Sequence, residues 1–157
     1  CGVVLVHELD ERLVRHAASQ MFDLVADVGS YPEFVPLCSD MRIRSSTPRP
    51  DGKEVVVAVM TIAYKLIRQS FTSRVTLDRQ NLTLFVDYLD GPFSRMHNKW
   101  VFHPKGETAC EVEFFIDYEF RSRAFALLAG AVFDQVFRRM VAAFEQRADK
   151  IYGRPTA

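Results

Sequence analysis

The chain has 157 residues, of which 48% are hydrophobic, and its 20 basic and 20 acidic side chains give a formal net charge of zero. This length suits a single domain over residues 1–157, and the apolar content excludes a disordered chain. The neutral charge gives no electrostatic case for a nucleic-acid partner, so we expect no DNA binding.

The three cysteines, Cys1, Cys38 and Cys110, are far apart and have neither a CxxC spacing nor a metal-ligand spacing. We therefore expect free thiols in a reducing, cytoplasmic compartment. No apolar run reaches the roughly 18–20 residues that a membrane-spanning helix needs. The first residues lack the basic region of a signal peptide, so Cys1 is interpreted as a trimmed start rather than a lipidated cysteine.

The first elements in chain order are an edge strand and a helix. Residues 7–16 are a weak strand pattern with many charges, which suits the edge of a sheet. An apolar face at helical spacing then predicts a helix over residues 20–28. Ser19 is its expected N-cap, and Gly29 is expected to end it.

The segment SYPEFVPLC, which begins at Ser30, is too apolar for an ordinary solvent loop. Ser30 and Glu33 have the spacing of a capping box, and its two prolines suit the start and the end of a turn. We expect a single helical turn that directs Tyr31, Phe34 and Val35 to one side.

Six strand patterns follow, at residues 40–46, 54–67, 68–78, 81–89, 94–104 and 109–120. The turns between them are short, so the strands predict an antiparallel sheet with one face on the core. Apolar and acidic residues alternate in the last pattern. Its acidic row is expected to lie on the outer face and to pair with basic side chains rather than a cation: Glu111, Glu113, Asp117 and Glu119.

A long C-terminal helix is predicted from about Ser122 to Tyr152, because only Gly130 opposes a helix there and Gly153 ends it. Its second half is amphipathic, but residues 124–133, AFALLAGAVF, are apolar all round. This run is too short to span a membrane. We therefore expect another protein surface, a lipid-like surface or a ligand to cover it.

No catalytic or metal-binding motif is present among HExxH, GxSxG, the P-loop and GxGxxG. The four histidines, at positions 7, 16, 97 and 103, have no metal-ligand spacing, and His7 and His16 are expected to be solvated. Cys38 is interpreted as a small buried thiol, because the sequence shows no activating base. We expect neither an enzyme nor a bound metal or cofactor.

Aromatic side chains are the better candidates for function. Tyr31, Phe34 and Phe93 lie in turn segments, where lining a cavity mouth is favoured over core packing. Trp100 shares a strand face with Phe102, and for it core packing and ligand contact stay equally open.

The segment AASQMFDLVADVGSYPEFVPLC closely resembles the opening of the coenzyme Q-binding START-like proteins of the polyketide cyclase/dehydrase-type superfamily. Two further blocks agree, LDGPFSRMHNKWVF (residues 89–102) and EVEFFIDYEFRS. The likeness covers residues 8–150, and the bacterial ribosome association toxin shares the same motifs. Residues 31–36 match without departure, whereas many relatives have Trp in place of Leu37.

The resemblance implies an α+β helix-grip fold of the START/Bet v 1 type, in which a curved antiparallel sheet wraps a long C-terminal helix. It also implies an elongated hydrophobic tunnel that holds ubiquinone or a similar isoprenoid lipid, without catalysis. The expected ligand-binding residues are Tyr31, Phe34, Val35, Pro36, Leu37, Phe71, Tyr88, Phe93, Trp100, Phe114, Tyr118, Leu128, Val132 and Val136. Candidate hydrogen-bond partners for the quinone ring are Tyr64, Tyr88, Tyr118 and Asn98.

Three functions remain open. A ubiquinone carrier or chaperone would support respiratory electron transport and touch the inner membrane peripherally through residues 124–133 and 31–37. A ribosome association toxin-like protein would bind the large ribosomal subunit and block subunit joining, although contact with rRNA usually needs a basic face. An enzyme acting on an aromatic polyketide would need a polar cavity with acid–base groups, which the apolar inward faces disfavour.

Overall fold

The structure is a computed structural model that describes residues 5–153, with side chains from residue 11 onward. Cys1 and the side chain of His7 lie outside this part. The strands are β1 (Leu5–Val14), β2 (Cys38–Pro48), β3 (Glu54–Tyr64), β4 (Ile67–Asp78), β5 (Thr83–Asp90), β6 (Phe93–Pro104) and β7 (Cys110–Phe120). The helices are α1 (Ala18–Ala26), the 3₁₀ helix η1 (Val28–Glu33), α2 (Arg123–Arg138) and α3 (Met140–Tyr152).

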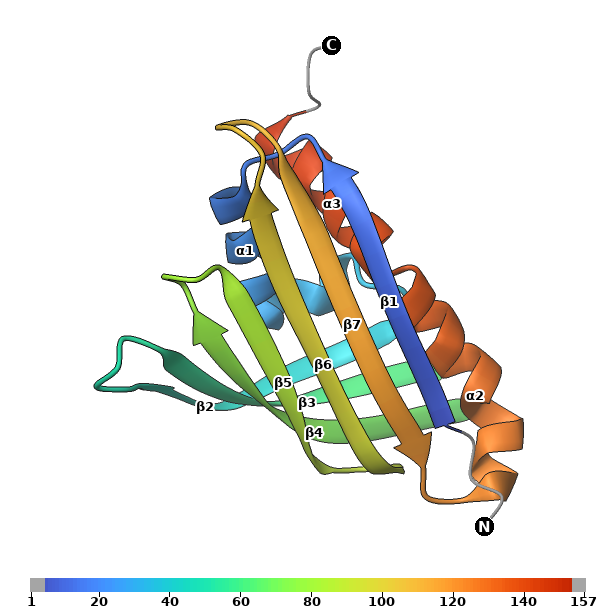
Figure 1. Ribbon diagram of the computed structural model, residues 1–157. Coiled ribbons are helices and arrows are strands. Elements are labelled where there is room, and N and C mark those ends of the chain that lie inside the picture. Colours follow the sequence, from blue (N-terminus) through green and yellow to red (C-terminus); the bar gives the residue numbers. More distant parts are fainter. Residues whose placement is uncertain (1–4, 154–157) are drawn as a thin grey trace.

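The strands form one antiparallel sheet in the order β1-β7-β6-β5-β4-β3-β2. This confirms the predicted sheet and places β1, as expected, at an edge. The sheet curves around α2 and α3, which run along its inner face, while α1 contacts both α3 and β6 (Figure 1). The α+β fold with a curved antiparallel sheet around the C-terminal helices is therefore confirmed.

The period of two along β7 is the clearest link between sequence and core. Every second residue from Cys110 to Phe120 is buried, and the acidic residues between them are not. The inner faces of β3 and β4 add Val56, Met60, Phe71 and further apolar side chains to the same core. Each large side chain buried in this way contributes about 1.5–3 kcal/mol to folding.

The start and the end of α1 differ from the prediction. Its N-cap is Ala17, whose N–H donates to the side chain of Gln20 at 3.2 Å, so Ser19 is not the cap. Gly29 does not end the helical region either, because the chain tightens after Asp27 into η1.

The capping box expected at Ser30 and Glu33 does not form. The Ser30 hydroxyl donates instead to Asp27 at 2.7 Å, and Glu33 pairs with Arg147 of α3 at 3.1 Å. Asp27, the N-cap of η1, and Arg147 of α3 thus satisfy the two residues, and the predicted helical turn becomes the six-residue 3₁₀ helix η1.

The strand predicted over residues 54–67 is two strands. β3 ends at Tyr64, Lys65 has a φ of 55°, and β4 begins at Ile67, which pairs with Tyr64. The sequence does not reveal this turn, because residues 65 and 66 are Lys and Leu rather than the Gly, Pro, Asn, Asp or Ser that are typical of turns. Leu66 is fully exposed at the tip.

The predicted long C-terminal helix is likewise interrupted. Ser122 caps α2 by accepting a hydrogen bond from the Phe125 N–H at 3.2 Å, and Gly130 stays helical. Arg139, with φ −93° and ψ 1°, separates α2 from α3. Within residues 5–153, no helix is long and apolar enough to cross a membrane.

The apolar run at residues 124–133 is covered on one side only. Ala129 and Phe133 are fully buried against the sheet, whereas Leu127 and Leu128 are 77% and 68% exposed. Nothing in the described part of the chain covers these two leucines.

Candidate functional site

A small cavity lies between the inner face of the sheet and the junction of α2 with α3, with room of about 60 Å³. Its helical wall is Phe137 and Met140, which stand on either side of the break at Arg139. The sheet supplies most of the remaining lining: Met41, Ala58, Met60, Phe71, Ser73, Val75, Leu84, Val86, Met96, Asn98, Trp100 and Phe114. Val28 and Tyr31 of η1 complete it.

Four of the chain's five methionines line this cavity, namely Met41, Met60, Met96 and Met140. Methionine has an unbranched, flexible side chain that repacks easily around irregular shapes. Three of these methionines are buried, and Met41 is half-buried at the β2 edge of the sheet. The cavity wall is therefore apolar and adaptable in shape.

Two polar side chains interrupt the apolar wall. Ser73 of β4 and Asn98 of β6 are 7% and 8% exposed. The Ser73 hydroxyl oxygen and the Asn98 Oδ1 atom are buried without a hydrogen-bond partner among the described residues. The Asn98 Nδ2 atom has a weak contact, at 3.6 Å, with the sulfur of Met96.

Tyr31 is fixed on both sides. Its hydroxyl donates to the backbone oxygen of Val25 at 2.5 Å, and its ring meets Phe144 of α3 edge-on. Burial, with smaller effects from nearby Cys38 and Asp27, raises the pKa of the Tyr31 phenol above its usual range. Tyr31 is therefore a neutral, anchored wall residue and not an acid–base group.

The thiols of Cys38 and Cys110 are both buried and free of disulfides. Burial raises the pKa of each thiol from 9.0 to about 11. A nucleophilic cysteine needs a lowered pKa. The interpretation of Cys38 as a buried thiol is thus supported.

Four predicted ligand-binding residues line the cavity: Tyr31, Phe71, Trp100 and Phe114. The other residues near η1 lie beside the cavity. Phe34 packs on Phe144, Val35 is buried, and Pro36 and Leu37 are half-buried. Leu37 has a φ of 61°, and its backbone oxygen accepts a hydrogen bond from Ala63, which ties η1 to β3.

Aromatic packing closes the end of the core under α2. Phe93 is fully buried and contacts the rings of Tyr88, Tyr118 and Phe133. Val132 and Val136 of α2 are buried but do not line the cavity. The structure therefore has a short cavity where the resemblance implied an elongated tunnel.

Leu128, an expected ligand-binding residue, does not line the cavity. It lies on the outer side of α2 because the helix turns Ala129, Val132 and Phe133 toward the sheet. Tyr64 does not line the cavity either, since it lies at the end of β3 and is 41% exposed. The Tyr88 hydroxyl accepts a hydrogen bond from the Phe93 N–H at 3.0 Å, outside the cavity wall.

Sequence reasoning missed the methionines and Ser73. Met60 and Met96 lie in the inward phase of their strands, but this phase does not distinguish an apolar residue beside a cavity from one in packed core. Ser73 and Asn98 carry a stronger signal, since each is a polar residue in the inward phase of an alternating strand. Of the two, Asn98 was expected as a ring partner.

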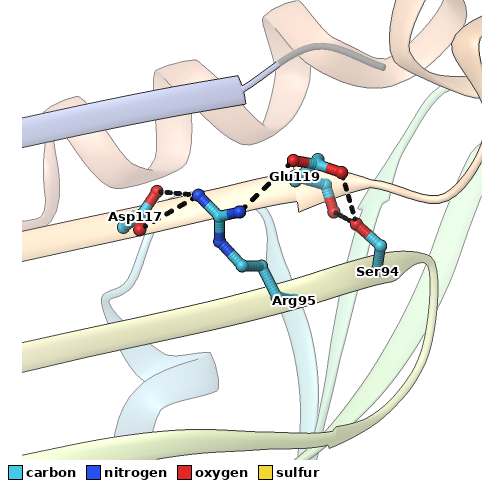
Figure 2. Close-up of polar contacts among 4 residues, drawn as sticks. All are labelled: Ser94, Arg95, Asp117 and Glu119. Carbon is cyan, nitrogen blue, oxygen red and sulfur yellow. Dashed lines mark hydrogen bonds and ion pairs between the residues drawn. The ribbon is translucent and has the colours of Figure 1, made fainter. Parts of the chain in front are cut away.

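The outer face of the sheet is a charged surface, as predicted. Figure 2 shows Arg95 of β6 reaching both Asp117 and Glu119 of β7, at 3.2 and 3.4 Å. The hydroxyl of Ser94 lies 3.2 Å from the backbone oxygen of Glu119. Further along, His103 lies 3.7 Å from Glu113. Three members of the acidic row, Glu113, Asp117 and Glu119, are therefore paired with basic side chains.

His16 was wrongly expected to be solvated. It is 5% exposed, and its Nε2 atom lies 2.7 Å from Asp149 of α3. His16 and Tyr152 both line a wider, open groove of about 650 Å³. Polar and apolar atoms contribute equally to the lining of this groove. The described residues contain no group of three or more His, Cys, Asp or Glu that could hold a metal.

Comparisons with known proteins agree with this fold. Residues 14–145 match the family described as polyketide cyclase/dehydrase and lipid transport. The ribosome association toxin RatA of Escherichia coli K12 is 38% identical over 89% of this chain and 85% of its own length. The coenzyme Q-binding protein COQ10 homolog B of Xenopus laevis is 29% identical over 92% of this chain and 59% of its own length.

Among solved structures, the Zhui aromatase/cyclase of Streptomyces superposes with a TM-score of 0.78 over 94% of this chain and 95% of that one, at 17% identity. That likeness shows a shared fold and says nothing of a shared reaction. The match over residues 14–145 and the identity to the toxin together show that the chain belongs to the polyketide cyclase/dehydrase and lipid transport family.

Proposed function

We propose that the protein binds an isoprenoid quinone, such as ubiquinone, in this cavity and carries it in support of respiratory electron transport. The observation that carries the proposal is the wall itself, which is almost wholly apolar and in which four methionines gather. An isoprenoid tail offers a long apolar chain, and burying each of its carbons gives about 0.8 kcal/mol. The name of the coenzyme Q-binding relative points in the same direction.

The cavity must enlarge to take such a ligand. Pockets that bind drug-sized ligands have volumes of about 300–1,000 Å³, against about 60 Å³ here. Phe137 and Met140 form the helical wall on either side of Arg139, where the helix is already interrupted. A small rotation of α2 about Arg139 would move Phe137 away from the sheet without unwinding either helix.

The proposal includes peripheral contact with the cytoplasmic face of a membrane, from which a carrier would take its lipid. Leu127 and Leu128 are exposed on α2, and Arg121 and Arg123 are exposed at its start. Exposed apolar side chains beside basic ones suit a bilayer with anionic headgroups. Leu66, with neighbouring Lys65 and Arg68, repeats this combination at the β3–β4 turn.

The proposal does not include catalysis. Among the described residues that line the cavity, none is Asp, Glu, His, Lys or Arg. Tyr31, the one titratable phenol of the wall, already donates its proton to a backbone oxygen. General acid–base chemistry needs a titratable group within reach of the substrate.

Two measurements test the proposal. Organic extraction of the purified protein, followed by mass spectrometry, should release an isoprenoid quinone. Titration with decylubiquinone should quench the fluorescence of Trp100, the chain's single tryptophan and a cavity residue. If no lipid is extracted and the fluorescence shows no saturable change, the carrier proposal fails.

A second candidate is binding to the large ribosomal subunit, which the name and the 38% identity of the bacterial toxin favour. Arg42 and Arg44 are exposed on the edge strand β2 and offer a basic contact for rRNA. This candidate predicts co-sedimentation with 50S particles at moderate salt, and weaker co-sedimentation of an Arg42→Glu, Arg44→Glu variant. The carrier proposal predicts no such pelleting.

A further inference from the structure

Ser73 and Asn98, the two polar side chains that interrupt the apolar cavity wall, reduce the stability of the fold. A buried hydroxyl or amide oxygen that lacks a hydrogen bond costs about 1–3 kcal/mol. The Ser73 hydroxyl and Asn98 Oδ1 both lack one among the described residues, although each side chain is more than nine-tenths buried. An alanine and a leucine at these positions would avoid the cost.

The two side chains stand on opposite sides of one strand. Val86 of β5 pairs with Asn98 of β6, and its neighbour Tyr88 pairs with Ser73 of β4. Because neighbouring strands lie about 4.8 Å apart, the β4 and β6 backbones are separated by roughly 10 Å. Ser73 and Asn98 therefore approach the cavity from either side of Val86, and the enlarged cavity would place a flat group between them.

Aromatic rings are close to this pair. Trp100 follows Asn98 by two residues on the same face of β6, and its ring centroid lies 4.4 Å from that of Phe114. Both rings line the cavity. Such faces bind a flat ring by stacking or edge contacts.

We propose that Ser73 and Asn98 form the head-group site of the ligand, which holds a flat ring with oxygen substituents, as in a quinone or its reduced quinol. This inference rests on the proposed function and assigns its polar end. The serine hydroxyl donates to a ring carbonyl or accepts from a ring hydroxyl. The Asn98 amide accepts from a hydroxyl through Oδ1, and donates to a carbonyl if it turns over and gives up its weak contact with Met96.

The site sets which lipids are bound rather than how tightly apolar chains are held. A site built to hydrogen-bond a polar group rejects an analogue without that group, because its own buried atoms are then left unpaired. The ligand tail would bind to the methionine-rich wall in either case. The polar pair would thus separate ring-headed lipids from plain hydrocarbons of the same length.

The test compares two probes that share a ten-carbon tail and a six-membered ring, decylubiquinone and decylbenzene. Quenching of Trp100 gives the dissociation constant of decylubiquinone, and competition against it gives that of decylbenzene. The wild-type protein should bind decylubiquinone at least tenfold more tightly than decylbenzene. Ser73→Ala and Asn98→Leu should each reduce this ratio by threefold or more, and mainly by weakening decylubiquinone.

Thr72→Ala is the matched control, because Thr72 precedes Ser73 on β4 and points to the outer face of the sheet. It should leave the ratio unchanged. Ser73→Ala removes only one buried atom, so it should fold even if Asn98→Leu does not, and thermal unfolding of each variant checks this.

The outcomes separate the two proposals. If the wild-type protein binds neither probe, the carrier proposal fails and the head-group site fails with it. If it binds both probes and neither variant changes the ratio, the cavity still binds apolar ligands but the head-group site is wrong. A change in thermal stability with an unchanged ratio would likewise contradict the head-group site, because it would show that the pair affects folding alone.

Discussion

Tyr31 of η1 and Phe144 of α3 lie edge to face, with ring centroids 5.2 Å apart and an interplanar angle of 76°. Phe144 is fully buried and also contacts the rings of Phe34 and Trp100. It therefore joins the SYPEFVPLC segment, which holds Tyr31 and Phe34, to the cavity wall. The hydroxyl of Tyr31 also donates a hydrogen bond to the backbone oxygen of Val25 in α1. One tyrosine thus connects three helices.

Tyr31→Phe should reduce the free energy of unfolding by about 0.5–1.5 kcal/mol, because it removes the hydrogen bond to the Val25 oxygen and keeps the ring packing. Urea denaturation measures the change. Tyr64→Phe, at a half-exposed tyrosine, is the control and should have almost no effect. Equal effects in the two variants would contradict the anchoring role of Tyr31.

Asp149→Ala should destabilise the fold by about 1–3 kcal/mol, because it leaves the buried His16 ring nitrogen without its partner. Asp134→Ala is the matched control. It breaks an exposed pair with Arg138 at 2.8 Å, which is worth about 0.3–0.5 kcal/mol. Thermal unfolding of both variants should separate them clearly, and a smaller loss for Asp149 would rule out the expected role of the buried pair.

Gly91→Ala should be strongly destabilising. Gly91 has a φ of 146°, and a Cβ there would lie 2.6 Å from the Cβ of Phe71. Overpacking of this kind costs about 1–3 kcal/mol, in addition to backbone strain. Gly52→Ala, which has a φ of 85° and open space around it, reports the backbone part alone. The steric argument predicts a larger loss at Gly91, measured by urea denaturation.

Stability should fall as the pH rises from about 9 to 11. Burial raises the pKa of Cys38 and Cys110 from 9.0 to about 11 in the folded protein. Below pH 9 the thiols are protonated in both states, so their contribution is complete. Between these values the unfolded chain loses protons that the folded protein keeps, which favours unfolding.

Urea denaturation at pH 8, 9.5 and 11 measures this decline. A Cys38→Ala, Cys110→Ala variant should show a flatter dependence, while Tyr31, whose pKa is also raised by burial, keeps part of the slope at the highest pH. An unchanged slope in the double variant would show that the thiols aren't its source.

Leu127→Ser, Leu128→Ser should weaken binding to vesicles of phosphatidylglycerol and phosphatidylcholine about tenfold, if α2 supplies the membrane contact. The loss follows from removing two exposed apolar side chains beside a basic helix start. Leu13→Ser is the control, because Leu13 is 63% exposed near the end of β1, where it pairs with Glu111 at the start of β7, far from the start of α2. Vesicle flotation measures the binding of each variant. Equal losses of binding in both variants would count against a specific membrane-binding surface on α2.

The sheet was predictable because its alternation is written directly in the sequence, as in β7. Two breaks were not. The turn after Tyr64 and the interruption at Arg139 contain neither glycine nor proline, and tertiary packing decides them instead. The capping box at Ser30 and Glu33 was wrongly predicted for a related reason, since Ser30 bonds back to Asp27 and Glu33 pairs with Arg147 of α3.

The cavity was predictable only in part. Trp100 and Phe114 follow from the inward phase of their strands. Phe93 and Val136 share the same apolar character, but close aromatic packing excludes them from the cavity. Sequence patterns state which side a residue faces and not whether space remains beside it.

The ion pairs of Arg95 with Asp117 and Glu119, and the bond from Ser94, lie on the outer face and touch nothing in the cavity. They nevertheless add to the alternating core in keeping β6 in register with β7. A slip of one residue along β6 would turn Asn98 outward and bring the imidazole of His97 inside. Charges on the outside of the sheet thus protect the protein against an error of alignment that would make its interior basic.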